Sequence, residues 1–432
     1  MRLFAVTGNP ILHSKSPLLF GAAYPDNKQD FCYFRLHADS ADEALKTFTE
    51  IGLSGMNVTA PFKSDILQLI ENRSDTTVAL NACNTIVATE KGLYADNTDT
   101  EGVSGAIHQA GTTIANARCL VLGAGGAGSA AAYALHKAGG IVTIANRTIE
   151  TAQALSKKIG CGFCGLDDLA EKMVYAEIIV NTLSADVIKT TWLTPHHTLL
   201  DAVYPNKTLR YKVENRCGKY IDGTQWLLHQ GVPAYRAFTG IAPNVDAMRQ
   251  RISQPSPYPR HIAFIGFMGV GKSTTAKLVA KQLDMPLVDT DLLIEKQCND
   301  TIPHIIQQKG EDYFRKIEQE VICQILAYPA PHLISCGGGA VTTPDVRTML
   351  HQNSIVIWLY APAEECLANI ENVASRPLLM QSGNPLLTAK RLFEERIPMY
   401  AQTAWMLVNT SNKTTEQVTK TIYDEVNRVL AH

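Results

Sequence analysis

The sequence predicts an α/β protein with at least two domains, each built on a mostly parallel sheet. Three observations lead to this prediction. Short β-rich runs alternate with helical stretches along the chain, which is the pattern of βαβ units. The chain has 432 residues, more than one ordinary hydrophobic core supports. Three prolines within residues 253–259 disfavour a helix and indicate an extended linker between two such regions.

The composition is that of a globular protein. Hydrophobic residues make up 46% of the chain and charged residues 19%, and the formal net charge of −2 gives no overall attraction to nucleic acid or to an anionic membrane. Apolar runs such as 262–267 are much shorter than the ~20 residues that cross a bilayer. Residues 1–10 lack the pattern of a secretory signal. We therefore expect a cytoplasmic protein whose partners are small molecules, with neither nucleic acid nor membrane among them.

The sharpest motif lies in residues 260–432, which we expect to form a separate domain after the 253–259 linker. Residues 266–273 match the phosphate-binding pattern G-x-x-x-x-G-K-S/T, between a predicted buried strand over 261–267 and apolar residues at helical spacing from Ala276 to Leu283. This context predicts a P-loop that binds ATP, in which Lys272 reaches the β- and γ-phosphates and the Ser273 hydroxyl ligates Mg²⁺. The residues expected to contact the nucleotide are Gly269, Val270, Gly271, Ser273 and Thr274.

Two aspartates, Asp289 and Asp291, follow at the end of a predicted strand over 287–291. Because side chains alternate along a strand, both carboxylates are expected on one side of its end. One would face the metal ion, and the other would orient and partly deprotonate an acceptor hydroxyl. The alternative is that the pair only caps a helix.

Four further motifs complete this region. They are G-E-D-Y-F-R at 310–315 with Glu318, C-G-G-G at 336–339, R-P-L-L at 376–379 and E-R-I-P-M-Y at 395–400. With the P-loop and the D-x-D sequence, in this order, they make residues 259–432 resemble shikimate kinase.

The resemblance to shikimate kinase implies roles for individual residues. Asp291 would contact the acceptor hydroxyls as a catalytic residue beside Lys272, Asp289 would support Mg²⁺, and Arg376 would lie against the adenine. On chemical grounds, Arg315 and Arg396 can hold a substrate carboxylate with their guanidinium forks, and glycines such as Gly338 let the backbone approach a ring closely. One departure concerns the lid near residues 379–387. Many members of the family have an arginine there, but none lies between Arg376 and Arg391 in this chain. Either Lys390 or Arg391 would then stabilise the transferring phosphoryl group, or Lys272 would do so without a second cation.

A second nucleotide site is predicted in the N-terminal half. A strand over 117–122 leads into a glycine turn at 123–128 and an Ala-rich helix that reaches Ala138, the arrangement of a Rossmann dinucleotide-binding unit. The next strand, 141–145, ends where the ribose-reading residue is expected. NAD sites usually have an acidic residue at this position, whereas this chain has Asn146, Arg147 and Thr148. Because the Arg147 guanidinium can bind a 2′-phosphate, we expect NADP(H) rather than NAD. The alternative is a capping Asn beside a solvated Arg. The residues of the turn expected along the coenzyme are Gly123, Ala124, Gly125, Gly126 and Ala127.

Loops of small polar residues occur on the N-terminal side of this unit. They are G-N-P-I-L-H-S-K-S-P at 8–17, N-V-T-A-P-F-K at 57–63, N-T at 84–85 and N-T-D-T-E-G at 97–102. Each alone is typical of a turn. Together, and in this order, they make residues 1–252 resemble shikimate dehydrogenase.

The resemblance to shikimate dehydrogenase implies a proton-transfer pair, Lys63 and Asp99. Reducing a ketone requires a proton on the developing alkoxide, which an ammonium hydrogen-bonded to a carboxylate can stabilise and supply. The residues implied to hold the hydroxyls and carboxylate of the ring substrate are Ser14, Ser16, Thr59, Asn84 and Gln230, with Tyr204 nearby. Ala202 and Gly223 would lie near the nicotinamide, and Asn181 and Thr182 along the coenzyme. Gln225 and Trp226 depart from the usual residues of the family, so altered packing is expected beside the nicotinamide.

The two resemblances imply consecutive reactions, because the hydroxyl made by reducing 3-dehydroshikimate is the one that the kinase phosphorylates. We expect an α/β substrate part over 1–99 and 225–252, a doubly wound NADP(H) part over 100–224, and a P-loop kinase domain over 260–432. Three alternatives remain open: a quinate-like dehydrogenase fused to a gluconate- or nucleoside-monophosphate-type kinase, a catalytically inactive sensor of shikimate or nucleotide, and a protein in which only one half is active.

Two pairs of residues are interpreted as structural. Cys161 and Cys164 form a C-x-x-C sequence, but no second such pair or His pair stands at ligand spacing, so buried thiols are preferred over zinc or redox chemistry. His196 and His197 follow a proline and are expected to be an exposed loop pair.

Overall fold

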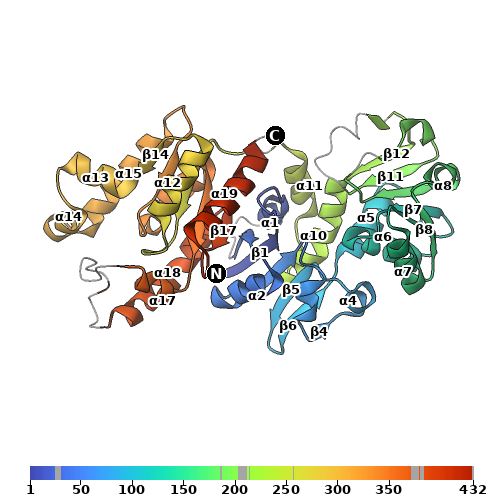
Figure 1. Ribbon diagram of the computed structural model, residues 1–432, viewed down its shortest axis with the longest axis horizontal. Coiled ribbons are helices and arrows are strands. Elements are labelled where there is room, and N and C mark those ends of the chain that lie inside the picture. Colours follow the sequence, from blue (N-terminus) through green and yellow to red (C-terminus); the bar gives the residue numbers. More distant parts are fainter. Residues whose placement is uncertain are drawn as a thin grey trace. The chain divides into compact units, whose positions relative to one another are not determined.

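The computed structural model describes residues 1–24, 31–184, 187–202, 212–213, 215–255, 257–370, 379 and 384–430. Its contacts divide the chain into two compact units (Figure 1). Unit 1 consists of residues 1–17, 29–54 and 256–432, and unit 2 of residues 18–28 and 55–255. Helix α1 (Ser16–Ala22) crosses the boundary between the two ranges.

Unit 1 contains seven parallel strands in the order β14-β15-β13-β16-β17-β2-β1. Strand β16 is buried along its whole length, as expected for an inner strand that helices cover on both faces. The strands are β1 (Arg2–Gly8), β2 (Phe31–His37), β13 (His261–Ile265), β14 (Leu287–Asp289), β15 (Leu333–Ser335), β16 (Ser354–Tyr360) and β17 (Met406–Asn409).

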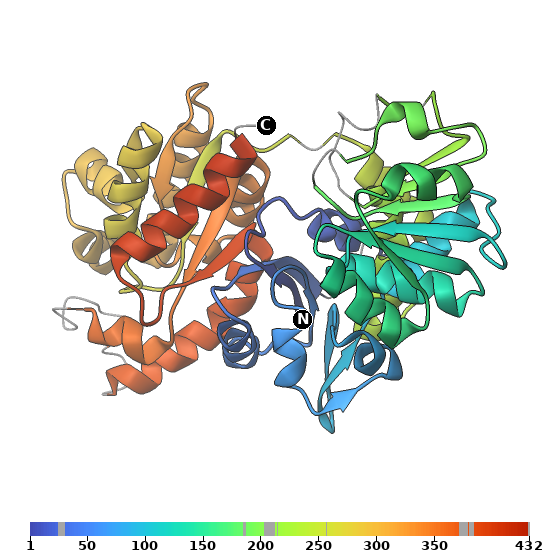
Figure 2. The ribbon, with the colours of Figure 1, turned by 45° about the vertical axis from the view of Figure 1, so that its right-hand side comes forward.

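The helices of unit 1 are α2 (Ala41–Glu50), α12 (Lys272–Leu283), α13 (Thr290–Cys298), α14 (Ile302–Lys309), α15 (Glu311–Leu326), η2 (Ala340–Thr342), α16 (Pro344–Asn353), α17 (Ala363–Ala368), α18 (Pro385–Thr403) and α19 (Thr415–Leu430). Helices α12 and α19 pack against each other. Figure 2 shows β17, in orange-red, running beside the blue strand β2, with which it pairs in parallel. Segments from both ends of the chain therefore share one sheet.

Unit 2 contains two groups of strands. In the first, the order is β3-β5-β6-β4, with β5 antiparallel to both β3 and β6. The second is a parallel six-stranded sheet in the order β12-β11-β10-β7-β8-β9. The strands are β3 (Gly55–Val58), β4 (Asn72–Arg73), β5 (Thr85–Thr89), β6 (Gly92–Asp96), β7 (Arg118–Leu122), β8 (Ile141–Asn146), β9 (Gly162–Gly165), β10 (Ile178–Asn181), β11 (Thr198–Asp201) and β12 (Lys219–Asp222).

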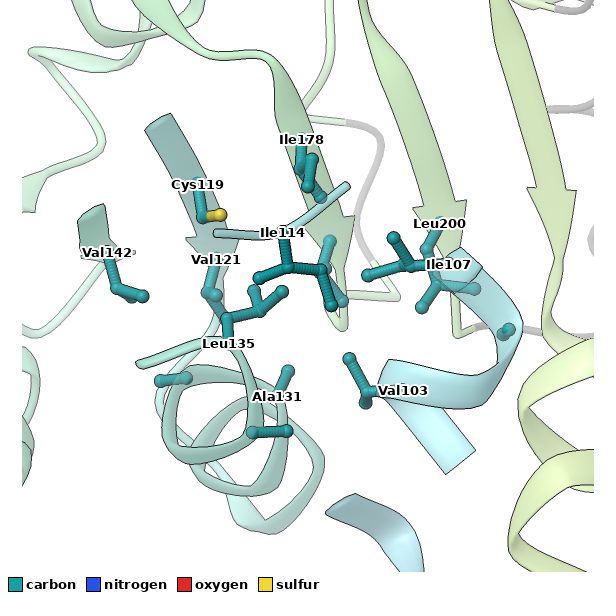
Figure 3. Packing of buried hydrophobic residues seen from close by; sticks show 14 of the residues in the cluster. Val103, Ile107, Ile114, Cys119, Val121, Ala131, Leu135, Val142, Ile178 and Leu200 are labelled. Atoms are coloured by element: carbon teal, nitrogen blue, oxygen red, sulfur yellow. The ribbon is translucent and has the colours of Figure 1, made fainter. Parts of the chain in front are cut away.

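The helices of unit 2 are α3 (Asp65–Gln68), α4 (Asp75–Leu80), α5 (Asp99–Gln109), α6 (Gly126–Lys137), α7 (Ile149–Ile159), α8 (Leu169–Tyr175), η1 (Thr190–Trp192), α10 (Gly223–Thr239) and α11 (Val245–Ser253). Figure 3 shows side chains of α5 and α6, including Val103 and Leu135, meeting those of β7 and β10, including Val121 and Ile178. This core holds the six-stranded sheet with its parallel carboxyl ends at one edge, where loops of doubly wound folds bind ligands.

The predicted α/β class is confirmed, with two differences in detail. The strand expected over 287–291 ends at Asp289, because Asp289 becomes the N-cap of α13 and accepts hydrogen bonds from the backbone N–H groups of Asp291 (3.1 Å) and Leu292 (3.4 Å). The expectation that His197 is exposed is wrong. Its ring is buried, with Nε2 3.0 Å from the Met173 carbonyl oxygen and Nδ1 accepting from the Thr194 N–H. None of the helices described here is long and apolar enough to cross a membrane.

Candidate active sites

The glycine turn after β7 has two positions at which no side chain would fit. Gly123 has φ +107°, and a β-carbon there would collide with the Thr182 hydroxyl, whereas one on Gly128 would collide with the Gly123 carbonyl oxygen. At Gly125, by contrast, a β-carbon would meet no atom within 4 Å. The turn is therefore tight on its inner side and open at Gly125, which is the N-cap residue of α6. Ala124 and Ala127 lie in the same turn and are partly buried.

Other predicted coenzyme residues lie at the same edge of the six-stranded sheet. Asn146 is the last residue of β8 and donates from Nδ2 to the Thr148 carbonyl oxygen (3.0 Å), and Arg147 is exposed beside them. Thr148 is the N-cap position of α7, so Asn146 does not cap that helix. The backbone of Gly223 lies close to that of Ala202, since a β-carbon on Gly223 would lie 2.9 Å from the Ala202 carbonyl oxygen.

Lys63 and Asp99 form an ion pair, with Lys63 Nζ 2.5 Å from Asp99 Oδ2. Their side chains are only 18% and 8% exposed. Asp99 is the first residue of α5, where the N-terminal end of the helix favours negative charge. A β-carbon on Gly126 would lie 3.7 Å from Lys63 Cδ. The structure thus brings the predicted proton-transfer pair next to the predicted coenzyme turn.

Asn84 and Gln230, 146 positions apart in sequence, also meet. Asn84 Nδ2 donates to Gln230 Oε1 (2.8 Å), and Asn84 Oδ1 accepts from the backbone N–H of Thr98 (2.8 Å). Helix α10 comes this close because Gly102 of α5 has no side chain, and a β-carbon there would collide with the Trp226 ring. Trp226 is 6% exposed and belongs to the buried cluster against which Ala124, Ala127 and Ala202 also pack.

The remaining predicted substrate residues of the N-terminal half lie in different places. Thr59 is half-buried in the turn after β3. Ser14 and Ser16 belong to unit 1, where both are buried and their hydroxyl oxygens are 3.2 Å apart. Tyr204 lies outside the described residues.

The P-loop occupies the turn between β13 and α12. Gly266, Gly269 and Gly271 have φ values of +148°, +78° and +89°, which residues with a side chain rarely adopt. Val270 is buried and Thr274 is exposed. Lys272 Nζ donates to the carbonyl oxygens of Gly266 (3.0 Å) and Phe267 (2.9 Å), so its ammonium is held inside the loop. Burial lowers the pKa of Lys272, although Asp291 acts in the opposite direction.

A hydroxyl and a carboxylate meet beside the P-loop. Ser273 Oγ donates to Asp289 Oδ2 (2.8 Å) and lies 3.3 Å from Ser335 Oγ. Oxygen donors of this kind suit Mg²⁺, which keeps several waters and takes few protein ligands. The described residues contain no group of three or more His, Cys, Asp or Glu side chains that could hold a metal ion.

Asp291, expected at a strand end, lies instead in the first turn of α13, where it faces the glycine turn after β15. A β-carbon on Gly337 would lie 2.5 Å from Asp291 Oδ1 and 2.8 Å from Glu318 Oε1, so both carboxylates flank this glycine. A β-carbon on Gly339 would collide with the Arg315 guanidinium. Gly337 and Gly339 therefore leave the room that the aspartate and the arginine occupy.

Two further side chains anchor this turn. Arg396 Nη1 and the Tyr400 hydroxyl both donate to the Gly338 carbonyl oxygen, at 3.3 and 2.7 Å. A β-carbon on Gly338 would lie 3.3 Å from the backbone nitrogen of Met268 in the P-loop. The glycine turn therefore lies against the P-loop.

The structure shows what two acidic residues of the 310–318 region contact, although the sequence assigned them no role. Glu318 is fully buried and accepts from Arg315 Nη1 (2.7 Å), while Arg315 Nη2 donates to Glu311 (2.9 Å). Burial raises the pKa of Glu318, and the neighbouring Arg315 opposes this shift. Glu318 lies three positions after Arg315 on α15, and this i,i+3 spacing is the sequence signal that predicts the pairing.

Arg376 and residues 380–383 of the predicted lid lie outside the described residues. Of the candidate substitutes for a lid arginine, Lys390 pairs with Glu364 (2.5 Å) and Arg391 with Glu395 (3.8 Å). Only Lys272 lies in the P-loop itself.

The C-x-x-C sequence has no reactive environment. Burial raises the pKa of both the Cys161 and the Cys164 thiols, whereas reactive cysteines have lowered values. Both are free cysteines.

Comparison with family models covers both halves of the chain. Residues 6–86 match the shikimate dehydrogenase substrate binding domain, 106–195 the shikimate / quinate 5-dehydrogenase model and 223–252 the shikimate 5′-dehydrogenase C-terminal domain. Residues 268–427 match the shikimate kinase model.

Individual relatives agree with these matches. The chain is 32% identical over 258 residues to the shikimate dehydrogenase (NADP(+)) of Pyrococcus abyssi, covering 58% of this chain and 97% of the relative. It is 37% identical over 168 residues to the shikimate kinase of Dehalococcoides mccartyi, covering 39% of this chain and 94% of the relative. The crystal structure of the Thermus thermophilus shikimate 5-dehydrogenase in complex with NADP(H) and shikimate aligns with a TM-score of 0.54 at 29% identity, over 59% of this chain and 99% of that one. The chain therefore belongs to two families, to the shikimate dehydrogenases through its N-terminal part and to the shikimate kinases through its C-terminal part.

Proposed function

We propose that the protein is a bifunctional shikimate-pathway enzyme. Its dehydrogenase part reduces 3-dehydroshikimate to shikimate with NADPH, and its kinase part phosphorylates shikimate to shikimate 3-phosphate with ATP. The proposal rests on membership of both families, with nearly the whole length of a relative covered in each case. The product of the first reaction is the acceptor of the second.

The Lys63–Asp99 pair carries the argument for the reductase. When bound, NADPH supplies hydride to the substrate carbon. The chain must then stabilise the developing alkoxide and give it a proton, which the Lys63 ammonium does. Asp99 accepts from that ammonium at 2.5 Å and holds it in position, and the low exposure of both side chains limits competition from water. The Asn84–Gln230 amide pair, Thr59, Ser14, Ser16 and Tyr204 are proposed to bind the ring substituents.

The coenzyme proposed for this site is NADP(H). The tight inner and open outer sides of the glycine turn fit a pyrophosphate at the N-terminus of α6. The exposed guanidinium of Arg147 suits a 2′-phosphate, because a phosphate accepts bidentate, charge-assisted hydrogen bonds from arginine. Ala202 and Gly223, at neighbouring strand ends, would border the nicotinamide.

For the kinase, the close approach of the P-loop to the glycine turn after β15 carries the argument. Lys272 and the P-loop N–H groups would hold the ATP phosphates, and Ser273 and Asp289 would hold Mg²⁺, which neutralises phosphate charge. Asp291 lies beside Gly337 of this glycine turn and would orient the acceptor hydroxyl and take its proton. Arg315 and Arg396 supply guanidinium groups for the acceptor carboxylate, and Arg376 is proposed to cover the adenine.

Product analysis of the purified protein tests both reactions. Given 3-dehydroshikimate and NADPH, it should oxidise NADPH and form shikimate, and addition of ATP and Mg²⁺ should convert shikimate to its 3-phosphate. Quinate and gluconate, supplied in parallel with NADP⁺ or ATP, should react far more slowly. Absence of NADPH oxidation would eliminate the reductase function, and absence of phosphorylated product from supplied shikimate would eliminate the kinase function.

A further inference from the structure

The loop that carries Ser14 and Ser16 is held by residues from the far end of the chain. We call residues 9–16 the serine loop. The Ser14 hydroxyl oxygen accepts from the backbone N–H of Ser16 (3.3 Å), and the N–H of Ser14 bonds to the Ile11 carbonyl oxygen (2.9 Å). This local pattern leaves the buried N–H groups of Ile11 and Leu12 in need of acceptors.

Glu425 of α19 supplies both acceptors. Its Oε1 accepts from the Ile11 N–H (2.8 Å) and its Oε2 from the Leu12 N–H (2.9 Å), across more than 400 positions of sequence. The carboxylate is 2% exposed, and Ile11 and Leu12 are fully buried. Two charge-assisted hydrogen bonds in a buried setting fix the backbone of the serine loop strongly.

Arg35 of β2 holds the other end of the loop. Its Nε and Nη2 both donate to the Ser14 carbonyl oxygen, at 3.0 and 2.7 Å, and its Nη1 donates to the Trp405 carbonyl oxygen (3.2 Å). The guanidinium carbon also lies 5.6 Å from the centre of the Trp405 ring. Arg35 therefore joins the serine loop to the residue just before β17.

The support from residues 405–430 extends beyond these contacts. Strand β17 pairs in parallel with β2 over Met406 to Val408, and Asn409 Nδ2 donates to Thr47 Oγ1 (2.9 Å). Lys413 bridges Asp39 and Glu43, at 2.7 Å from each. Most of this segment lies within the match to the shikimate kinase family, yet it is built onto the strand and helix that follow the serine loop.

We propose that residues 405–430 have a second task, which is to orient the serine loop for the dehydrogenase, with Glu425 as the principal positioning residue and Arg35 as its counterpart. The inference rests on the proposed reductase function, in which Ser14 and Ser16 bind the ring substrate. Glu425 does not touch the reacting atoms in this scheme. It acts through the backbone of residues 11 and 12, so its loss weakens substrate binding more than the chemical step.

Glu425→Gln in the full chain tests the proposal. The amide keeps the size of the side chain but presents an NH₂ group to one of the two N–H donors. The KM for 3-dehydroshikimate should rise about tenfold, the expected effect of one lost charge-assisted hydrogen bond. The kcat of reduction should change much less, and the KM for NADPH and the phosphorylation of supplied shikimate should not change. Retained kinase activity shows that α19, which packs on the P-loop helix α12, is still folded.

Asp424→Asn is the matched control, because it removes the same charge from the adjacent, exposed position of the same helix and should leave both reactions unchanged. Arg35→Lys is the second test, since lysine loses the fork that grips the Ser14 carbonyl oxygen and should also raise the KM for 3-dehydroshikimate. An unchanged KM in both the Glu425 and Arg35 variants would overturn the inference. So would loss of both reactions together, because that indicates a purely structural role. If the unaltered protein itself failed to oxidise NADPH, the proposed reductase function would fall first.

Discussion

Replacing Lys63 tests whether this residue donates a proton in the reductase site or serves only as the ion-pair partner of Asp99. Lys63→Ala removes the ammonium that lies 2.5 Å from Asp99, and no other lysine or arginine is hydrogen-bonded to that carboxylate among the described residues. We expect reduction of 3-dehydroshikimate to be nearly abolished. Phosphorylation of supplied shikimate should persist, because the P-loop and its neighbours belong to the other compact unit.

The size of the effect follows from the environment of Lys63. General acid catalysis by a positioned side chain contributes about 10² to 10⁴ in rate. Lys63 is 18% exposed and Asp99 8% exposed, so water has limited access to replace the ammonium as proton donor. We therefore expect kcat/KM to fall by about 10³, which corresponds to roughly 4 kcal/mol of transition-state stabilisation.

The assay is the steady-state oxidation of NADPH over a range of 3-dehydroshikimate concentrations. Lys63→Arg is the decisive companion variant, since arginine keeps the charge next to Asp99 but does not release a proton readily. Its kcat should fall nearly as far as that of Lys63→Ala. Lys91→Ala, at an exposed position in the same unit, should behave like the unaltered protein. A Lys63→Arg variant with normal kcat would refute the proton-transfer role and leave Lys63 as a structural partner of Asp99.

Three further predictions concern the other parts of the two sites. Asp291→Asn should lower the kcat of shikimate phosphorylation by about 10² or more while NADPH oxidation continues, and equal loss of both reactions in product analysis would contradict independent sites. Arg147→Ala should raise the KM for NADPH about tenfold without changing the weaker use of NADH, so an unaltered ratio of the two coenzymes would exclude contact with the 2′-phosphate. Gly128→Ala places a methyl group against the Gly123 carbonyl oxygen and should lower Tm and weaken NADPH binding. Gly21→Ala is the control: Gly21 lies in a helix, and its new methyl group would have no atom within 4 Å. This variant should raise the free energy of unfolding by about 0.5–1 kcal/mol. Thermal unfolding and NADPH titration check this last pair, and equal behaviour of the two variants would contradict it.

The sequence predicted the strand, turn and helix at both glycine turns, because this pattern is local. The P-loop and the dinucleotide turn each need glycines at special backbone angles, a buried strand before them and a helix after them, and all three signals lie within about 25 residues. The structure has β13 and α12 around Gly266–Ser273, and β7 and α6 around Gly123–Gly128. The prediction that Asp291 lies at a strand end was wrong. It assumed that strand alternation continues past Asp289, but Asp289 caps a helix. Capping was the alternative interpretation of this pair, and Asp289 both caps α13 and accepts from Ser273.

The prediction that His197 is exposed was wrong for a different reason. A proline followed by two histidines is polar and turn-like in sequence, but burial depends on what packs over the turn. Here α8 provides the Met173 carbonyl oxygen and the turn provides the Thr194 N–H, so the ring satisfies both nitrogens inside the protein.

By itself, the sequence determined the α/β class, the two glycine turns between a strand and a helix and the likeness to two families, since each depends on short runs of residues whose spacing is visible along the chain. Only the tertiary structure decided which distant side chains meet. Asn84 and Gln230 join because Gly102 lets α10 approach α5, and Glu425 reaches Ile11 because β17 extends the sheet beside β2. Such contacts span 146 and 414 positions, and they depend on strand order and helix packing, which no local pattern encodes.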